Sequence, residues 1–311
     1  MRILLLGKIG QLGWELQRAL PTFGKVVALD YPELDLLQLS RIPQIVRDIQ
    51  PDVIINSTAY TAVDQAESEP DKAQTINGLA PGVLAEAARV RGAVFIHFST
   101  DYVFDGHKGS PYLESDRPNP LCVYGSSKLA GEQAVAEVGG VYLILRTSWV
   151  YSLRRDSFVT KVLQWARQKD QLRIVSDQVS NPTWARMLAE VTAQLLVKAS
   201  RQSTVTKGRL PAAEYSDTAG LHDWLGERSG LYHLAGSGFA SRLDWASAIL
   251  KYDPRPQEQL ARALLPASTL EFPSPAQRPL FSALNCDHFT DTFGLLLPPW
   301  EEALKLAMEA E

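Results

Sequence analysis

The chain of 311 residues is long enough for one large domain or two moderate ones. Hydrophobic residues make up 45% of it and charged residues 21%, which is the balance of an ordinary globular protein. The net charge of −4, without a block of lysine or arginine, argues against a nucleic-acid partner.

Two further features bear on the compartment. Cys122 and Cys286 are too few for a disulfide framework, so we expect two reduced thiols. The apolar run at residues 3–6 is too short for a signal peptide, and no segment approaches the roughly 20 apolar residues of a membrane span. We therefore expect a cytoplasmic protein that has no membrane partner.

The start of the chain predicts a dinucleotide-binding unit. The apolar run Ile3–Leu6 indicates a strand buried on both faces, and a glycine turn formed by Gly7, Gly10 and Gly13 follows it directly. An amphipathic helix is predicted from Trp14 onward. Strand, glycine turn and helix together suit a pyrophosphate, because the turn lets the backbone approach it and the helix start offers N–H donors.

A carboxylate ends the next expected strand. Asp30 lies about 20 residues after Gly10, where an acid can accept hydrogen bonds from the adenosine ribose. No lysine or arginine occurs in residues 31–36, whereas Glu33 and Asp35 add negative charge. Local charge therefore favours a cofactor without a 2′-phosphate.

Strands and helices alternate through the first half of the chain. Expected strands at 52–56 and 93–98 alternate with expected helices at 42–50 and 73–91, the last interrupted at residues 77–78. This alternation predicts right-handed β-α-β units and a parallel sheet.

We therefore expect an α/β fold with a Rossmann-type doubly wound parallel sheet over residues 1–150. A smaller C-terminal α/β substrate-binding region is expected over residues 151–311, with some segments returning to the first domain. Residues 200–230 mix glycine, proline and charged side chains and are interpreted as a surface insertion.

Short polar stretches follow two of the expected strands. Residues 57–64 come after the strand at 52–56, and Ser99, Thr100 and Asp101 come after the strand at 93–98. Ligands of open parallel sheets bind beyond the carboxyl ends of the strands. These stretches are therefore candidates for contact with a cofactor and a substrate.

Tyr124 and Lys128 lie four residues apart, just before a run of good helix formers. On a helix they would share one face, and a nearby ammonium would lower the phenol pKa from about 10. The pair could then act as a general acid. His97 and His233 lie in apolar strand contexts and are expected in the core, and no histidine pair has metal-ligand spacing.

Taken together, these motifs resemble the extended short-chain dehydrogenase/reductases and, within them, the dTDP-4-dehydrorhamnose reductase family. The resemblance extends from residue 1 to about residue 300. The stretches that carry it are residues 7–16, Asn56 with 59–64, 66–70, 98–104, Tyr124 with Lys128, 146–151, Asp177-Gln178 with Pro182-Thr183, Arg278-Pro279 and Leu284-Asn285.

The resemblance implies that NADPH or NADH reduces the C4 ketone of dTDP-4-dehydro-6-deoxy-L-mannose to give dTDP-L-rhamnose. It also implies a catalytic set of Thr100, Tyr124 and Lys128. Tyr124 would donate the proton, and Thr100 would hydrogen-bond the developing alkoxide. Lys128 would lower the tyrosine pKa and reach the nicotinamide ribose.

The remaining predicted contacts fall into two groups. The predicted cofactor-binding residues are Gly7, Gly10, Gln11, Leu12, Gly13, Asp30, Asp35, Leu36, Ala59, Tyr60, Thr61, Tyr124 and Lys128. The predicted contacts with the dTDP-sugar are Thr100, Asp101, Val103, Trp149, Asn181 and Arg278. Among the latter, Arg278 could pair with the diphosphate.

Some relatives form a homodimer bridged by Mg²⁺ through helix carboxylates. Glu15 matches one of those positions, but Arg186 stands where another acid would be expected. A homodimer therefore stays open, a Mg²⁺ bridge is doubtful, and no metal ligand is assigned.

Three alternatives to the family's reaction remain. The chain could be another nucleotide-sugar reductase, a dehydratase or epimerase of the same superfamily, or a non-catalytic cofactor-binding regulatory subunit. A dehydratase needs a glutamate after Thr-Asp, whereas Tyr102 follows Asp101 here. The presence of Thr100, Tyr124 and Lys128 argues against a regulatory subunit.

Overall fold

A computed structural model of the chain describes residues 1–206 and 218–309. Its centre is a six-stranded, all-parallel sheet with the strand order β10-β5-β4-β3-β1-β2. The strands are β1 (Arg2–Leu6), β2 (Lys25–Leu29), β3 (Val53–Asn56), β4 (Val94–Thr100), β5 (Tyr142–Thr147) and β10 (Gly230–His233). The strand order reverses between β1 and β3, which is where a sheet of this kind opens a crevice for a ligand.

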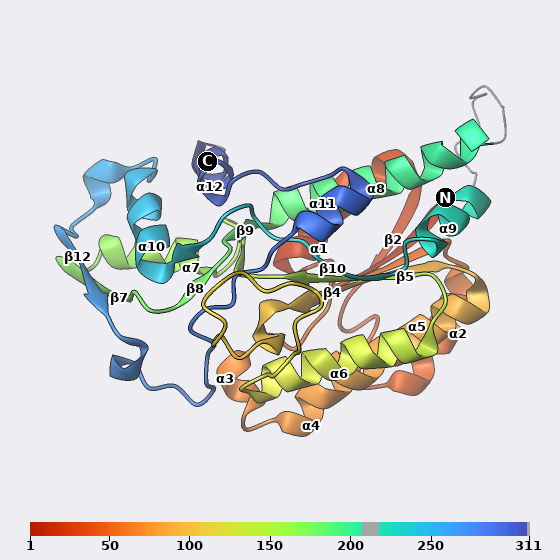
Figure 1. Ribbon diagram of the computed structural model, residues 1–311, viewed down its shortest axis with the longest axis horizontal. Coiled ribbons are helices and arrows are strands. Elements are labelled where there is room, and N and C mark those ends of the chain that lie inside the picture. Colours follow the sequence, from red (N-terminus) through yellow and green to blue (C-terminus); the bar gives the residue numbers. More distant parts are fainter. Residues whose placement is uncertain (207–217, 310–311) are drawn as a thin grey trace.

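Helices cover both faces of the sheet (Figure 1). One face carries α1 (Gln11–Ala19), α8 (Ala185–Thr206), α9 (Thr218–Gly226) and α11 (Asp287–Phe293). The other carries α2 (Ile42–Ile49), α5 (Ala80–Arg91) and α6 (Val123–Val138). Strand β1 shows why: Ile3 and Leu5 point into the first core, whereas Leu4 and Leu6 point into the second. The predicted doubly wound parallel sheet is therefore confirmed.

The second half of the chain builds a smaller lobe with its own core around Tyr151 and Trp245. Strands β7 and β12 pair in parallel, and two pairs of two-residue strands lie beside the cleft described below. The elements of the lobe are β6 (Val150–Tyr151), α7 (Phe158–Ala166), β7 (Gln171–Val175), β8 (Val179–Ser180), β9 (Thr183–Trp184), β11 (Ala240–Ser241), α10 (Arg242–Lys251), β12 (Ala263–Ala267) and α12 (Trp300–Glu309).

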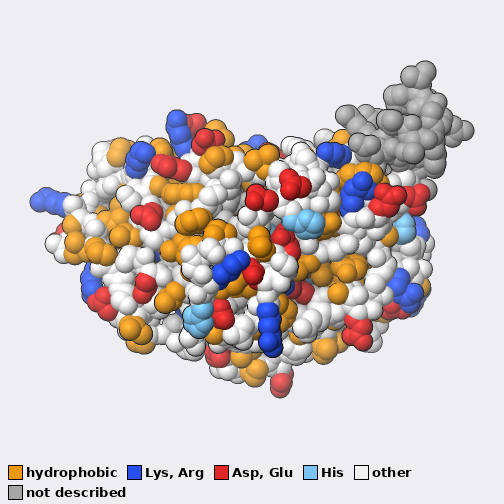
Figure 2. Space-filling model, viewed as in Figure 1, with side chains coloured by type: hydrophobic (Ala, Val, Ile, Leu, Met, Phe, Trp, Pro, Cys, Tyr) orange, Lys and Arg blue, Asp and Glu red, His pale blue; other side chains and the backbone are white. Residues whose placement is uncertain are grey.

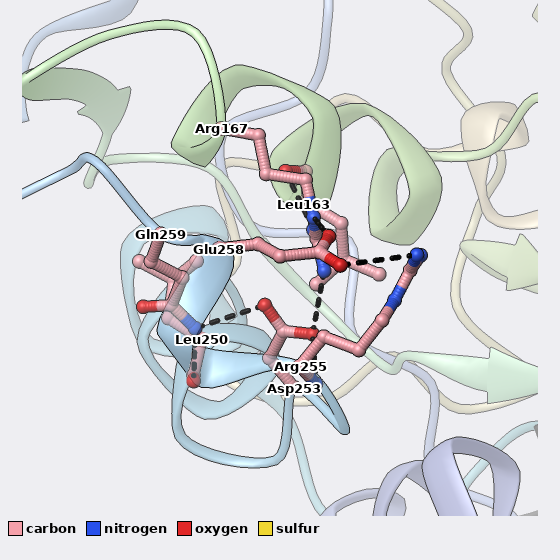
Figure 3. A network of polar contacts seen from close by, with 7 residues as sticks. All are labelled: Leu163, Arg167, Leu250, Asp253, Arg255, Glu258 and Gln259. Carbon is pink, nitrogen blue, oxygen red and sulfur yellow. Dashed lines mark hydrogen bonds and ion pairs between the residues drawn. The ribbon is translucent and has the colours of Figure 1, made fainter.

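A polar network fixes α10 against α7 within this lobe (Figure 3). Arg167, just after α7, binds Asp253 at 2.8 Å and Glu258 at 2.7 Å. Gln259 donates to Asp253 and to the carbonyl of Leu250, each at 3.0 Å. Because the Asp253 side chain is fully buried, these contacts hold the segment that follows α10 in one position.

The expected helix over residues 73–91 is interrupted in a specific way. After α3 (Val63–Ala66) and α4 (Pro70–Ala73), residues Gln74–Leu79 form a π-helical turn that runs directly into α5. The widened turn places Asn77 so that it bonds both backbone groups of Tyr60, at 2.8 and 3.1 Å, and the Ser127 hydroxyl at 3.1 Å. Asn77 thus joins the loop after β3 to the start of α6.

The segment interpreted as an insertion is described only in part. Helix α8 continues to residue 206, and residues 207–217 lie outside the described part. Beyond them, α9 buries Leu221 and Leu225 in the core that covers the sheet. Strand β12 and helix α11 are among the elements that the sequence did not predict.

On the face drawn in Figure 2, acidic and basic side chains are interspersed. Among the described residues, no helix combines the length and the apolar character that crossing a membrane requires.

A buried ion pair anchors α6 to the sheet. Glu132 and Arg146, on β5, form two hydrogen bonds of 2.9 and 2.6 Å, and their side chains are only 6% and 2% exposed. The Ser99 hydroxyl on β4 donates to the same carboxylate. The helix is therefore held by two neighbouring strands, one turn beyond Lys128.

We expect Arg146→Met to destabilise the fold by about 3–5 kcal/mol, because it leaves the Glu132 charge buried without a partner. The measurement is urea unfolding. Glu132→Met combined with Arg146→Met should cost less than the sum of the single variants, since no charge is then stranded.

Arg89→Met is the matched control, because Arg89 forms an exposed ion pair with Glu86 and its loss should change stability little. Equal stability of the Arg146→Met and Arg89→Met variants would show that the buried pair does not anchor α6.

Candidate active site

A cleft of about 730 Å³ opens at the carboxyl ends of the central strands, next to the point where the strand order reverses. Its lining comes from both halves of the chain. The first half supplies the glycine turn, the ends of β3 and β4, the start of α6 and residues 147–150, and the second half supplies Arg155, Asp156 and Arg242.

The glycine turn is shaped by close backbone contacts. Gly7 has φ of +92°, which favours glycine. A Cβ at Gly13 would lie 1.8 Å from the Gly7 carbonyl oxygen, so α1 can start this close to β1 only without a side chain there. The first N–H groups of α1 follow Gly10, which lines the cleft, and this is the geometry that binds a pyrophosphate.

The charges around this turn come partly from residues that the sequence analysis missed. Asp30 lines the cleft and accepts a hydrogen bond from the Ile9 amide at 3.1 Å. Lys8 is paired with Glu33 at 2.7 Å. Arg155, from the second lobe, lines the cleft and donates to the Ile9 carbonyl. No local sequence pattern connects Arg155 with a turn almost 150 positions earlier.

The structure brings most of the predicted cofactor residues to the cleft. Those that line it are Gly7, Gly10, Gln11, Leu12, Asp30, Ala59, Thr61, Tyr124 and Lys128. Gly13 lies behind the turn, and Leu36 is buried in the core beside α2. Tyr60 and Asp35 do not line the cleft. The Tyr60 hydroxyl donates to Glu69 at 2.7 Å, and the Asp35 carboxylate accepts from the Leu37 amide.

The three predicted catalytic residues lie together. Thr100 ends β4, Tyr124 and Lys128 lie in the first two turns of α6, and all three line the cleft. The sulfur of Cys122 caps the helix by accepting from the Gly125 amide at 3.5 Å. The expected shared helix face is therefore confirmed.

One electrostatic prediction for this group was wrong. Burial raises the pKa of Tyr124 above its ordinary value, and the nearby Thr100 hydroxyl opposes that rise only in part. The Lys128 ammonium instead donates to the Phe98 carbonyl at 2.7 Å. Burial lowers the pKa of Lys128 to about 8, against the influence of Glu132. A high phenol pKa keeps Tyr124 protonated, as a proton donor requires.

His97 lies behind Lys128 without accepting a hydrogen bond from it. Asn56 accepts from the Thr58 amide, so its amide nitrogen faces Nδ1 of His97, 3.1 Å away. Nδ1 of His97 must then accept a hydrogen bond from the Asn56 amide group. The ring hydrogen is therefore on Nε2, which lies 3.4 Å from the Lys128 nitrogen. Burial, followed by the Lys128 charge, lowers the pKa of His97, so the ring is neutral. The expectation of a buried histidine is confirmed, but the sequence did not indicate its contact with Lys128.

Asp101 joins the two halves of the site. Its carboxylate is 1% exposed and accepts from Ser282 at 2.5 Å, Ser180 at 3.0 Å and Thr100 at 3.2 Å. Burial raises its pKa to about 6, and these hydroxyl groups limit the rise. Both serines belong to the second lobe, so the carboxyl next to Thr100 is held by segments distant in sequence.

The predicted substrate residues divide between the cleft and its surroundings. Thr100, Asp101 and Trp149 line the cleft. Trp149 has φ of +40°, which is strained for a bulky residue, and its ring stacks on Trp245 with centroids 5.4 Å apart.

The other three predicted substrate residues lie elsewhere. Val103 is fully buried in a separate apolar cluster. The Asn181 side chain is occupied with backbone groups, including the Gly238 carbonyl at 2.8 Å. Arg278 is paired with Asp64 at 2.7 Å and does not line the cleft.

Glu15, the residue considered for a metal bridge, has cationic neighbours. Burial raises its pKa, whereas Arg186, Arg18 and Arg154 oppose that rise. Arg186 also binds Glu190 at 3.0 Å. Among the described residues there is no group of three or more His, Cys, Asp or Glu side chains that could hold a metal ion.

Comparisons with known proteins agree with this geometry. The model of a family described as "RmlD substrate binding domain" matches residues 1–311. The chain is 41% identical to a dTDP-4-dehydrorhamnose reductase from Burkholderia thailandensis, covering 99% of this chain and 98% of that protein. It also resembles two crystal structures of dTDP-4-dehydrorhamnose reductases, each 32% identical and covering 100% of this chain and 99% of the other. One is from Clostridium acetobutylicum, with a TM-score of 0.85, and the other is from Bacillus anthracis in complex with NADP, with a TM-score of 0.84.

We expect Gly13→Ala to disrupt the glycine turn, because its Cβ would overlap the Gly7 carbonyl oxygen. The expected result is loss of NADPH binding, measured by the change in cofactor fluorescence, together with lower stability in urea. Gly226→Ala is the control, since a Cβ there meets only a Val141 methyl group at 3.4 Å. Wild-type NADPH affinity in Gly13→Ala would rule out this role for the turn.

Asp101 predicts a pH dependence of stability. Its carboxyl ionises at about pH 6 in the folded chain and near the ordinary value of 3.8 when unfolded. Its contribution is therefore fully present below about pH 4 and lost as the pH rises through about 6. Relative to Asp101→Asn, the free energy of unfolding of the wild type should fall across this window by at most about 1.4 kcal/mol per pH unit. A difference that stays flat between pH 4 and pH 7 would contradict the raised pKa.

Proposed function

This chain belongs to the dTDP-4-dehydrorhamnose reductase family, and we propose that Thr100, Tyr124 and Lys128 carry out the family's reaction in the cleft. The protein is an NAD(P)H-dependent oxidoreductase that reduces the C4 ketone of dTDP-4-dehydro-6-deoxy-L-mannose to give dTDP-L-rhamnose. The observation that supports the site assignment most strongly is that all three side chains line one cleft, beside a glycine turn suited to a pyrophosphate.

The turn from Gly7 to Gly13 fits a dinucleotide. Because Gly13 has no side chain, helix α1 begins close against the Gly7 carbonyl, and the start of the helix lies at the cleft. Asp30 would accept hydrogen bonds from the adenosine ribose, and Arg155 would face the pyrophosphate. When bound, NADPH or NADH supplies the hydride.

The protein's own groups supply the proton and stabilise the developing charge. As C4 is reduced, negative charge grows on its oxygen. Tyr124, kept protonated by its buried position, gives its proton to that oxygen. The Thr100 hydroxyl, which donates to Asp101 in the structure, would turn to donate a hydrogen bond to that oxygen instead. Lys128, held by the Phe98 carbonyl, would reach the nicotinamide ribose.

In the same proposal, the two lobes bind different ligands. Residues 1–150 would hold the cofactor, and residues 151–311 would mainly hold the sugar nucleotide, with α8, α9, α11 and β10 contributing to the first lobe. We also infer that the enzyme works in the cytoplasm. A homodimer stays a prediction.

The alternative reactions find less support at the site. In a dehydratase a glutamate would follow Thr-Asp, whereas the residue in that position is Tyr102, whose ring packs edge-on against Tyr124 at 5.5 Å. A regulatory subunit would not need Thr100, Tyr124 and Lys128 to meet in one cleft.

We expect Tyr124→Phe to lower kcat by about 10²–10⁴, because it removes the general acid and keeps the ring. The measurement is oxidation of NADPH in the presence of the 4-keto sugar nucleotide. Tyr142→Phe is the control, since Tyr142 starts β5 at the end of the sheet away from the cleft. Wild-type turnover by Tyr124→Phe with cofactor bound would contradict the role of Tyr124.

The reaction itself is tested by supplying dTDP-4-dehydro-6-deoxy-L-mannose with either NADH or NADPH. We expect ketone-dependent oxidation of the cofactor and formation of dTDP-L-rhamnose. Incubation with dTDP-glucose and NAD⁺ should give no 4-keto-6-deoxy sugar. The reverse pattern would indicate a dehydratase, and a stoichiometric protein partner without ketone-dependent oxidation would indicate a regulatory subunit.

A further inference from the structure

The cleft contains a cation to which the proposed reaction assigns no role. Arg242 is the first residue of α10 and lines the cleft together with Thr100 and Tyr102. Its guanidinium carbon lies 3.6 Å from the centre of the Trp149 ring and 5.4 Å from that of Trp245. The planar cation is therefore held by aromatic stacking.

Arg242 also has no anionic partner in the described part of the chain. Within residues 1–206 and 218–309, no carboxylate lies within 4.0 Å of its guanidinium, which forms no hydrogen bond there. Burial lowers its pKa to about 10, and the neighbouring Tyr102 and Asp101 offset this effect only in part. The side chain is half-buried and its guanidinium has five N–H donors, so it is able to bind an anion in the cleft. Among the described residues, no carboxylate competes for it with whatever binds there.

The position of Arg242 indicates which anion it would meet. The glycine turn before α1, on the first lobe, suits the cofactor diphosphate, whereas Arg242 belongs to the second lobe. The sugar nucleotide carries its diphosphate on C1, which lies across the pyranose ring from C4. With C4 at Tyr124, the diphosphate lies about one sugar ring away. Tyr102, whose ring packs edge-on against Tyr124, lines the same cleft as Arg242.

Arg278, which the sequence suggested for the diphosphate, is less well placed. It is bound to Asp64 at 2.7 Å and to the Ala276 carbonyl at 3.1 Å, so its charge and donors are already in use. It does not line the cleft, whereas Arg242 does.

We propose that Arg242 binds the diphosphate of the dTDP-sugar and thereby selects a nucleotide-linked sugar. This inference rests on the proposed function, and it assigns the substrate's charged group to a particular residue of the second lobe. The guanidinium can form a bidentate pair with phosphate oxygens while Trp149 holds its plane. Arg242 is then a specificity-determining residue with no part in proton or hydride transfer.

Arg242→Met tests this assignment, because methionine keeps an apolar stem over Trp149 and removes the charge. We expect the Kd for dTDP, measured by calorimetry, to rise by about tenfold to a hundredfold, the range for losing hydrogen bonds to a charged group. KM for the sugar nucleotide should rise similarly, with a much smaller change in kcat and no change in the Kd for NADPH. Arg242→Lys should have an intermediate effect, since it retains the charge without the fork of donors.

Arg255→Met is the matched control, because Arg255 is an exposed arginine of the same lobe that pairs with Glu258 away from the cleft. Wild-type dTDP affinity in Arg242→Met would overturn the proposal, as would an equal loss of NADPH affinity, which would indicate general disruption of the cleft. If the methionine variant does not fold, the lysine variant decides: weaker dTDP binding with unchanged NADPH binding supports the proposal, and unchanged dTDP binding contradicts it.

The same measurements separate this inference from the proposed function. A wild-type chain that turns over the 4-keto sugar, alongside an Arg242→Met variant with unchanged dTDP affinity, would overturn the assignment of Arg242 alone. A wild-type chain that neither binds dTDP nor oxidises NADPH with the keto sugar would overturn both.

Discussion

The buried contact between Glu132 and Arg146 is the constraint on which the geometry of the site depends. It ties α6 to β5, while Ser99 ties the same carboxylate to β4. The first two turns of α6 carry Tyr124 and Lys128, and β4 ends in Thr100, so these contacts set the distance between the helix and the strand end. A buried ion pair contributes little net stability compared with apolar side chains in the same place. Any other position of α6 would leave the Glu132 charge buried without its partner, so the pair still holds the helix in one position.

The cleft is completed by polar groups from the second lobe. Ser180 and Ser282 hold the buried Asp101, Arg155 contacts the glycine turn, and Arg242 faces the cleft from α10. The carboxyl ends of the parallel strands provide a rigid floor. In the proposed reaction, a general acid on one lobe would meet a sugar nucleotide held largely by the other.

Much of the first half could be predicted from local sequence. Continuous apolar strands, the glycine turn and the i,i+4 spacing of Tyr124 and Lys128 specify nearby structure, and the family resemblance is confirmed by the comparisons. The sequence could not predict that burial outweighs Lys128 at the Tyr124 phenol, because burial depends on tertiary packing. Nor could it predict that Arg278 pairs with Asp64, or that Arg242 has no carboxylate partner among residues 1–206 and 218–309, since both depend on contacts between distant segments. The sequence did not predict the edge strand β12, because it contains Pro266 and a proline argues against a strand.

We propose that one cleft brings the nicotinamide to C4 of the keto sugar while the protein supplies the proton to its oxygen. The most direct measurement is the position of deuterium in the product after reaction with cofactor deuterated at the transferable hydride position. We expect dTDP-L-rhamnose with deuterium on C4 and on no other carbon, because hydride passes directly from cofactor to ketone. Deuterium on another carbon, or an unlabelled product formed without oxidation of the cofactor, would contradict it.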